Sequence, residues 1–219
     1  MKKSISILAL LVILSAGAFA QGINLSAGGG LLFDWSGNNG IKVNEQGVNG
    51  YMGIRNTSIG GYVFFDATYV EMDVSFAYGS ISGVLEGDFK NIGISESDMK
   101  GSMTQLGFSL LGKYPIDMGG FTLFPLLGIN YNLVLSMKDK DGNSYDGNGD
   151  KSSDWSQFGF LGGLGADFNL TNAVYLRAEG MLDLRLASKV MKDSLDAMSV
   201  GSATLGVGPR IKVGVGYKF

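Results

Sequence analysis

Charged side chains recur at positions of the same parity in several stretches of the sequence. Glu71 and Asp73 are two residues apart, as are Arg210 and Lys212. In an extended strand, residues two apart point to the same face, so acids and bases from neighbouring strands can pair across that face. The chemistry that this pattern predicts is ion pairing. The candidate charge network is Asp34, Asp66, Glu71, Asp73, Lys113, Arg177, Glu179, Asp183, Arg185, Arg210 and Lys212.

Catalytic chemistry has little support in the composition. The sequence contains neither histidine nor cysteine, so the usual Ser-His and Cys-His nucleophile pairs cannot be built. A Ser-Lys dyad and a carboxylate pair such as Glu71 and Asp73 stay conceivable, but carboxylates opposite cations are more simply explained by ion pairing. We therefore predict that the protein is not an enzyme, has no catalytic residues and uses no cofactor.

A segment rich in aspartate and asparagine, residues 138–154, contains the best candidates for metal ligands. Carboxylate and amide oxygens are the ligands that Ca²⁺ prefers. The EF-hand spacing fails, because a loop that starts at Asp139 has Ser144 where glycine is required, and one that starts at Asp146 has Lys151. We predict a solvated loop without a metal site, and calcium binding there is left open. The oxygen-bearing residues are Asp139, Asp141, Asn143, Asp146, Asn148, Asp150 and Asp154.

The first twenty residues have the pattern of an export signal. Lys2 and Lys3 precede an apolar run over residues 5–14, and Ala18 and Ala20 give the small-x-small pattern of a signal-peptidase site. The run is shorter than the ~20 apolar residues of a spanning helix, which disfavours an uncleaved anchor. The sequence therefore predicts a signal peptide at residues 1–20 and one mature domain at residues 21–219.

Alternation of apolar and polar residues is the dominant pattern of the mature chain. In residues 205–219 every second residue is apolar, and those between them are glycine or cationic. Seven earlier segments alternate in a similar way. Short turns are expected near residues 67–69, 115–120 and 169–173, and long polar loops at residues 36–56, 87–102, 138–154 and 188–201. The pattern predicts an all-β fold, namely an eight-stranded antiparallel up-and-down transmembrane β-barrel.

Aromatic residues on the apolar faces fall into two sets, about ten residues apart along the strands. Tilted strands climb roughly 2.4 Å per residue, so ten residues cover about 24 Å, the height of the apolar band of an outer-membrane barrel. A soluble β-sandwich or lipocalin-like fold is disfavoured, because its outward faces would be more polar. The predicted aromatic girdles contain Trp35, Phe65, Tyr69, Tyr78, Tyr114, Phe121, Tyr131, Phe158 and Phe168.

The closing residues Val213, Val215, Tyr217 and Phe219 resemble the C-terminal signal read by the bacterial barrel-assembly machinery, which ends in an aromatic residue. The whole mature chain resembles the small outer-membrane barrels of the OmpA transmembrane-domain, OmpX and OmpW type. The resemblance is architectural and implies outer-membrane lipid as the surroundings, assembly by that machinery, and a monomer. The chain departs from the OmpW pattern, because its predicted lumen is charged rather than apolar.

The lumen of such a barrel is only wide enough for side chains to fill it. Buried charges must then pair with one another or carry a large desolvation cost. In the last hairpin we expect Arg210 near Asp183 and Lys212 near Glu179, so the favoured interpretation is a salt-bridged plug. A narrow path for ions or water and a conduit for a small apolar ligand are the alternatives.

The sequence narrows the function only to classes. The formal net charge of −3, with no basic stripe, disfavours a nucleic-acid partner. The favoured hypothesis is a structural, surface-display or adhesion barrel whose loops meet a host or surface ligand. A small passive pore for ions or small solutes is the alternative. The loop residues that display would use are Lys42, Glu45, Lys90, Glu96, Lys138, Asp141, Asp146 and Lys192.

Overall fold

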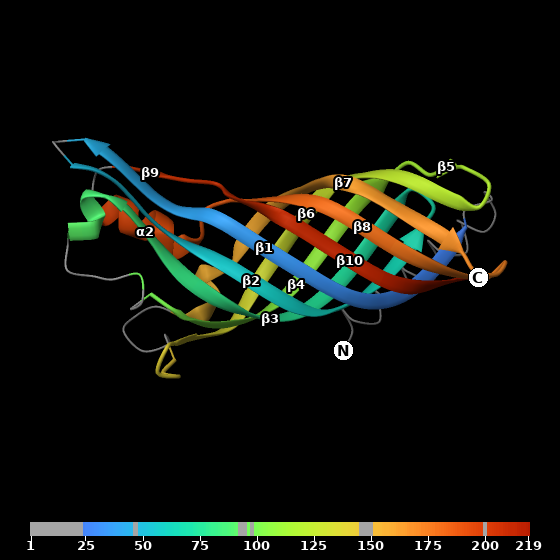
Figure 1. Ribbon diagram of the computed structural model, residues 1–219, viewed down its shortest axis with the longest axis horizontal. Coiled ribbons are helices and arrows are strands. Elements are labelled where there is room, and N and C mark those ends of the chain that lie inside the picture. The colour runs from blue at the N-terminus through green and yellow to red at the C-terminus, as the bar shows by residue number, and fades with distance from the viewer. Residues whose placement is uncertain (1–23, 46–47, 92–95, 97–98, 145–150, 199–200) are drawn as a thin grey trace, which may run out of the picture.

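Long antiparallel strands dominate the computed structural model, which describes residues 24–45, 48–91, 96, 99–144, 151–198 and 201–219. In this part of the chain, eight strands pair in sequence order and the last returns to pair with the first (Figure 1). The all-β, antiparallel, up-and-down arrangement is thus confirmed. The ring strands are β1 (Leu25–Glu45), β2 (Val48–Ala67), β3 (Val70–Gly87), β4 (Gly101–Lys113), β6 (Phe121–Asp139), β7 (Gln157–Asn169), β8 (Val174–Arg185) and β10 (Gly206–Lys218).

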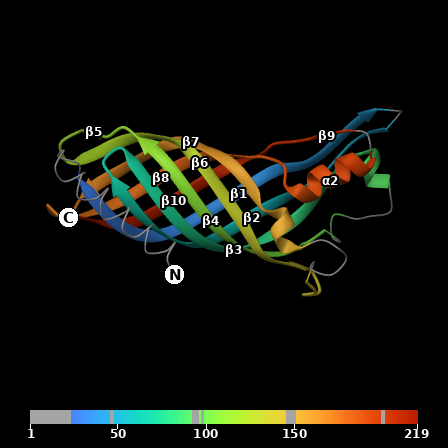
Figure 2. The same ribbon diagram turned by 180° about the vertical axis from the view of Figure 1, so that it is seen from behind.

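Shorter elements lie at the two ends of the ring. The two-residue strand β5 (Ile116–Asp117) pairs with β6 in a turn, and β9 (Ser202–Ala203) pairs with β1 at the opposite end. That opposite end also carries the helix α2 (Lys189–Met198) and the 3-10 turns η1 (Asp88–Asn91) and η2 (Ser152–Trp155) (Figure 2). No helix in the described part of the chain is long and apolar enough to cross a bilayer. The signal peptide predicted at residues 1–20, with Ala18 and Ala20, lies outside the described residues.

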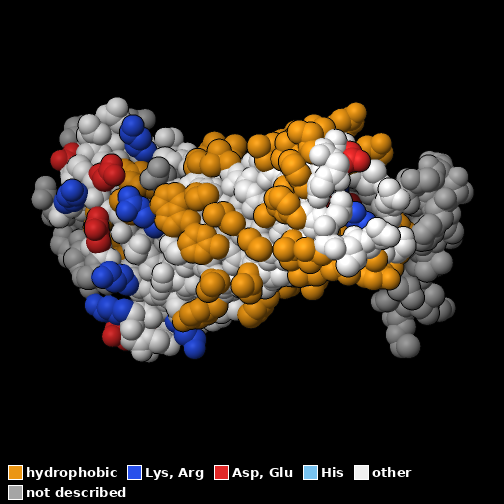
Figure 3. All heavy atoms as spheres, turned by 45° about the vertical axis from the view of Figure 1, so that its right-hand side comes forward, with side chains coloured by type: hydrophobic (Ala, Val, Ile, Leu, Met, Phe, Trp, Pro, Cys, Tyr) orange, Lys and Arg blue, Asp and Glu red, His pale blue; other side chains and the backbone are white. Residues whose placement is uncertain are grey.

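The strands bury their polar residues and expose their apolar ones. On β3, Val74 and Phe76 are exposed while Glu71 and Asp73 are buried. This burial pattern is the reverse of a water-soluble sheet, and it is expected where the outer surface meets lipid. Figure 3 shows the hydrophobic side chains spread over the strand surface, with charged side chains gathered at the end that carries α2.

Ring closure satisfies the backbone of the first and last strands. The β1–β10 register runs from Ser26 opposite Lys218 to Gly37 opposite Val207. A lipid-exposed open edge would leave its N–H and C=O groups without partners, at several kcal/mol each. Closure therefore removes the edges that a bilayer could not solvate.

The predicted loop at residues 36–56 is wrong, because most of this segment continues β1 and β2 as a hairpin beyond the other strands (Figure 1). The pairing shifts between Ser36 and Asn39 and then runs on to Glu45 and Val48. A hairpin that stands in water needs no apolar outer face. The alternation of apolar and polar residues that identified the lipid-facing strands therefore did not predict this hairpin. The predicted loop at residues 188–201 also contains order, namely α2.

Large side chains in the interior pack directly against glycines, in the space where a Cβ atom would otherwise lie. A Cβ on Gly216 would lie 2.1 Å from the ring of Tyr175, and a Cβ on Gly165 would lie 2.2 Å from the ring of Phe124. Glycine in a strand commonly marks such a close approach. The rings belong to two buried apolar clusters, one with Leu32, Tyr62, Phe64, Ala77 and Tyr175, the other with Leu111, Phe124, Leu126, Leu161 and Met181.

Candidate functional site: the charged lumen

All eleven residues of the candidate charge network are buried, each with an exposed fraction of 9% or less. They come from six of the ring strands, so they meet only because the ring closes. The structure adds a twelfth charge, Asp167 on β7, which the sequence reasoning missed. The signal was present, since Asp167 directly precedes Phe168, which the sequence analysis assigned to an outward-facing aromatic girdle, and neighbouring residues of a strand point to opposite faces. The buried charges fall into two groups, defined here as the turn-end cluster and the loop-end cluster.

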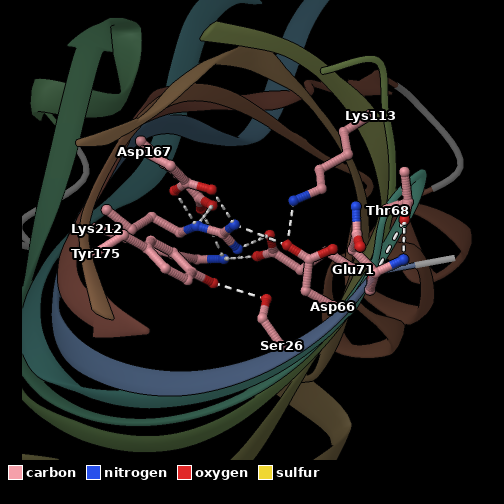
Figure 4. A network of polar contacts seen from close by, with 11 residues as sticks. Ser26, Asp66, Thr68, Glu71, Lys113, Asp167, Tyr175 and Lys212 are labelled. Carbon is pink, nitrogen blue, oxygen red and sulfur yellow. Dashed lines mark hydrogen bonds and ion pairs between the residues drawn. The ribbon is translucent and has the colours of Figure 1, made fainter. Parts of the chain in front are cut away.

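The turn-end cluster lies near the short turns, and Figure 4 shows its members Asp66, Glu71, Lys113, Asp167 and Lys212. Arg177 is its centre, because it forms ion pairs with three of the carboxylates. Arg177 binds Asp167 with two hydrogen bonds, from Nε to Oδ1 and from Nη2 to Oδ2, both 2.7 Å long. It also donates to Glu71 at 2.6 Å and to Asp66 at 2.7 Å. Paired N–H groups of one guanidinium give the strongest and most directional ion pairs available to a side chain. The cluster comprises Asp66, Glu71, Asp73, Lys113, Asp167, Arg177, Glu179 and Lys212.

Two lysines complete the turn-end cluster. Lys113 donates to Asp66, so this carboxylate receives hydrogen bonds from β4 and β8 together. Lys212 donates to Asp73 at 2.6 Å, and its Nζ lies 3.4 Å from Glu179 and 3.8 Å from Glu71. Each lysine therefore joins strands that are not neighbours in the sheet.

Aromatic rings pack against the cations of this cluster. The guanidinium carbon of Arg177 lies 4.4 Å from the centre of the Phe64 ring and 5.2 Å from that of Tyr175. Lys113 Nζ lies 4.6 Å from the Phe124 ring centre. Such contacts contribute about 2 kcal/mol when they are desolvated. The Tyr175 hydroxyl is held in turn by a 2.7 Å hydrogen bond with Ser26 (Figure 4).

The loop-end cluster is smaller and consists of Asp34, Asp183, Arg185 and Arg210. Arg185 donates to Asp183 from Nε and Nη2, both at 2.9 Å, and also donates to Asp34. Arg210 Nη2 lies 2.9 Å from both carboxylates. Neutral partners extend the cluster, since Asn130 donates to Asp183 at 3.1 Å and Arg210 donates to Asn132 at 3.2 Å.

The register of the last hairpin sets these contacts. Lys212 stands opposite Glu179, whereas Gly208 stands opposite Asp183. Arg210 therefore lies two residues away from the Asp183 position and reaches it through the length of its side chain. Both pairs expected from the sequence, Arg210 with Asp183 and Lys212 with Glu179, are present, at 2.9 Å and 3.4 Å. Counting placed Arg210 level with Asp183, whereas the contact is diagonal and depends on the side-chain conformation.

The aspartate-rich segment behaves differently, because its charge stands in water. Asp139 Oδ1 accepts hydrogen bonds from the backbone N–H groups of Asp141 and Asn143, and Oδ2 accepts one from the Asn143 side chain. These hydrogen bonds lower the pKa of the Asp139 carboxyl, and the bond from the Asn143 side chain has the largest effect. Within the residues that the structure describes, no group of three or more acidic side chains is placed to hold a metal ion. Asp146, Asn148 and Asp150 lie outside those residues.

Aromatic residues of the predicted girdles lie on the outer surface, exposed or, for Phe121, half-buried. At the turn end Tyr69, in the turn before β3, stacks on Tyr114, just after β4, with ring centres 6.4 Å apart. Phe121 and Phe168, on the neighbouring strands β6 and β7, stack at 5.7 Å. The residues of the predicted assembly signal, Val213, Val215, Tyr217 and Phe219, are exposed on the same surface.

An apolar outer surface around a closed, charged interior defines a transmembrane β-barrel. Residues 6–219 match the family model described as the outer membrane protein beta-barrel domain. The chain belongs to this family, and it is a protein of the bacterial outer membrane.

Similar solved structures share little sequence with this chain. Ail, the attachment invasion locus protein of Yersinia pestis, crystallised with the heparin analogue sucrose octasulfate, is 15% identical over 90% of this chain and 99% of that chain, with a TM-score of 0.41. A major outer membrane protein from Thermus thermophilus is 13% identical over 90% and 99%, with a TM-score of 0.44. No curated protein matches the sequence. The family assignment therefore rests on the family model.

Proposed function

We propose that this protein is an eight-stranded outer-membrane barrel whose lumen is plugged by side chains and whose role is structural or surface display, not catalysis. The observation that carries the proposal is the ion-pair network that crosses the lumen. Arg177 alone joins carboxylates from β2, β3 and β7. A side chain held from three directions cannot move aside without breaking several charged hydrogen bonds, each worth about 1.5–3 kcal/mol.

Single-channel conductance of the refolded mature chain in a planar bilayer tests the plug. We expect no current from the wild type and openings from the double variant Arg177→Ala with Arg210→Ala, because it removes a bulky side chain from each of the two clusters. Lys42→Ala, which removes an exposed cation from the β1–β2 hairpin, is the matched control and is expected to stay silent. Steady openings of the wild type would overturn the plug and favour the alternative, a small passive pore for ions or small solutes.

The elements at the end of the barrel opposite the short turns support a role in surface display. The β1–β2 hairpin, β9 and α2 project there (Figure 2), and they carry exposed charges such as Lys42 and Lys192. A ligand on a host or another surface would meet these residues first. Binding of whole bacteria to host-matrix glycans and proteins, compared between the wild type and a hairpin shortened between Asn39 and Ile54, tests this role. Equal binding by both would count against it.

We also propose that Val213, Val215, Tyr217 and Phe219 are read by the barrel-assembly machinery, that the aromatic girdles meet the lipid headgroups, and that the barrel is a monomer with no nucleic-acid partner. The exposed aromatic end of β10 supports the assembly role. We expect Phe219→Ser to lower the yield of folded barrel in the membrane. Tyr217 remains as an internal aromatic in that variant, so an unchanged yield would count against recognition of the terminal residue.

A further inference from the structure

Two adjoining hollows lie at the loop end of the barrel, above the loop-end cluster. The outer hollow, defined here as the apolar pocket, has a volume of about 100 Å³ and is bounded by the β1–β2 hairpin and α2. The inner hollow, the polar chamber, has a volume of about 20 Å³. Asn39, Ile54 and Trp155 line both, so the two hollows adjoin at these three residues.

The apolar pocket has the lining of a small-molecule site. Its walls are side chains of Ile41, Met52, Ile54, Met99, Trp155 and Met191. Methionine side chains are flexible and adapt to irregular apolar ligands. Predominantly apolar walls with a few polar groups at one end are typical of ligand pockets.

The polar chamber supplies those polar groups. Asn39, Asn56 and Asn132 line it and are each at most 3% exposed. Four side-chain atoms of these three asparagines have no hydrogen-bond partner within the described residues: Asn39 Oδ1, both Oδ1 and Nδ2 of Asn56, and Asn132 Nδ2. A buried polar atom without a partner costs about 1–3 kcal/mol, so a ligand group that reached these atoms would recover that cost.

The charge of the chamber limits the kind of group that fits. Arg185 is its charged lining residue, and Asp34 and Asp183 already neutralise it. The unpartnered atoms comprise two acceptors and two donors. A carboxylate can only accept and an ammonium can only donate. An uncharged group that does both, such as a primary amide or a hydroxyl, matches the chamber.

We propose that the two hollows form a binding site for a small uncharged amphiphile, with its apolar body in the pocket beside Trp155 and its amide or hydroxyl head in the chamber beside Asn56. An apolar cavity of about 150 Å³ admits benzene, so the smaller pocket fits a body of about four or five carbons. The ligand would enter from the outside of the cell, since the charge clusters lie beneath the chamber.

Tryptophan fluorescence of the folded barrel in lipid nanodiscs tests this site. The chain has two tryptophans, so Trp35→Phe leaves Trp155 as the sole reporter. Pentanamide is the probe and pentanoate its charged counterpart of the same length. We expect a saturable change with pentanamide in the millimolar range and a dissociation constant at least tenfold larger for pentanoate. A signal that rises linearly without saturation, or equal binding of the two probes, would overturn the proposal.

Two variants in the Trp35→Phe background locate the binding. Asn56→Leu removes the unpartnered amide and is expected to weaken pentanamide binding at least tenfold. Val190→Phe, on α2, narrows the apolar pocket and is expected to abolish saturation. Leu127→Phe, which enlarges a side chain on the lipid face, is the matched control and should bind normally. Unchanged binding by both Asn56→Leu and Val190→Phe would overturn the site. The comparison of pentanamide with pentanoate binding needs neither of these variants, so it tests the site even where a variant does not fold. It is also independent of whether the barrel conducts.

Discussion

The turn-end and loop-end clusters contain the same residue types in different balance. The turn-end cluster sets three cations against five carboxylates, whereas the loop-end cluster has two of each. Their surroundings differ too. A pocket of about 240 Å³ at the turn end is lined by Asp66, Lys113 and Asp167, whereas the hollow that Arg185 lines at the loop end has a volume of about 20 Å³.

This difference indicates how much negative charge a barrel interior can hold. Coulomb repulsion between carboxylates falls as the local dielectric rises, so an excess of acids is tolerated better beside a pocket. The loop-end cluster borders only the small polar chamber, through Arg185, so it has less such relief, and its charges balance. The turn-end cluster also concentrates its contacts on one residue, Arg177, whereas Arg185 and Arg210 share the two loop-end carboxylates.

Loss of Arg177 should have the largest effect. Arg177→Met leaves Asp66, Glu71 and Asp167 with fewer cations in a cluster already rich in acids. We expect the free energy of unfolding, measured by urea titration of the barrel in lipid vesicles, to fall by about 3–5 kcal/mol. The double variant Arg177→Met with Asp167→Leu should recover part of the loss. A fall below about 1 kcal/mol would contradict the central role of Arg177.

Loss of Arg210 should cost less. In Arg210→Met, Asp34 and Asp183 both keep their contacts with Arg185. We expect a fall of about 2–3 kcal/mol in the same urea titration, because one charged partner is lost and one remains. If Arg210→Met destabilises the barrel more than Arg177→Met, the contrast between shared and concentrated pairing is wrong.

Removal of one acid should act differently in the two clusters. Neither oxygen of Glu179 has a hydrogen-bond partner within the described residues, and Glu179 belongs to the cluster with excess acids. We expect Glu179→Gln to keep stability within about 1 kcal/mol of the wild type or to raise it. Asp183→Asn removes the charge that Arg185 and Arg210 share, and we expect a loss of about 2 kcal/mol. Equal losses from both substitutions would contradict the role of charge balance.

Asp139 provides a reference for a carboxylate in water and should have the smallest effect. Hydrogen bonds from Asn143 and Asp141 lower its folded-state pKa below the ordinary value of 3.8. Its stabilisation of the turn is therefore present above about pH 3.8 and is lost as the pH falls through the lowered pKa. We expect the protection of the Asp141 and Asn143 amides, measured as their exchange rate relative to the intrinsic rate at the same pH, to fall only in that acid range. In Asp139→Ala this protection should be lost at neutral pH as well. Global unfolding by urea should not change.

The sequence predicted the transmembrane part of this fold well, because a two-residue period is a local property. Alternation alone assigned the sides of the strands, and it placed Glu71, Asp73, Arg210 and Lys212 on the inner face that the structure gives them. Alternation did not predict the strands that lie outside the lipid, where water surrounds the chain. The β1–β2 hairpin beyond Ser36 stands outside the lipid band, so its strands carry no apolar outer face, and composition suggested a loop.

The sequence by itself determined which side chains enter the lumen and which face the lipid, since parity along a strand settles both. Counting along the last hairpin also paired Arg210 with Asp183 and Lys212 with Glu179, but only the tertiary structure decided which acids and bases meet across the lumen. Arg177 and Glu71 are 106 residues apart and lie on strands that are not neighbours in the ring. Their contact depends on the stagger of the strands and on the narrow width of the closed barrel, which no local pattern contains. The apolar pocket beside Trp155 has the same origin, because the hairpin and α2 meet only once the ring has closed.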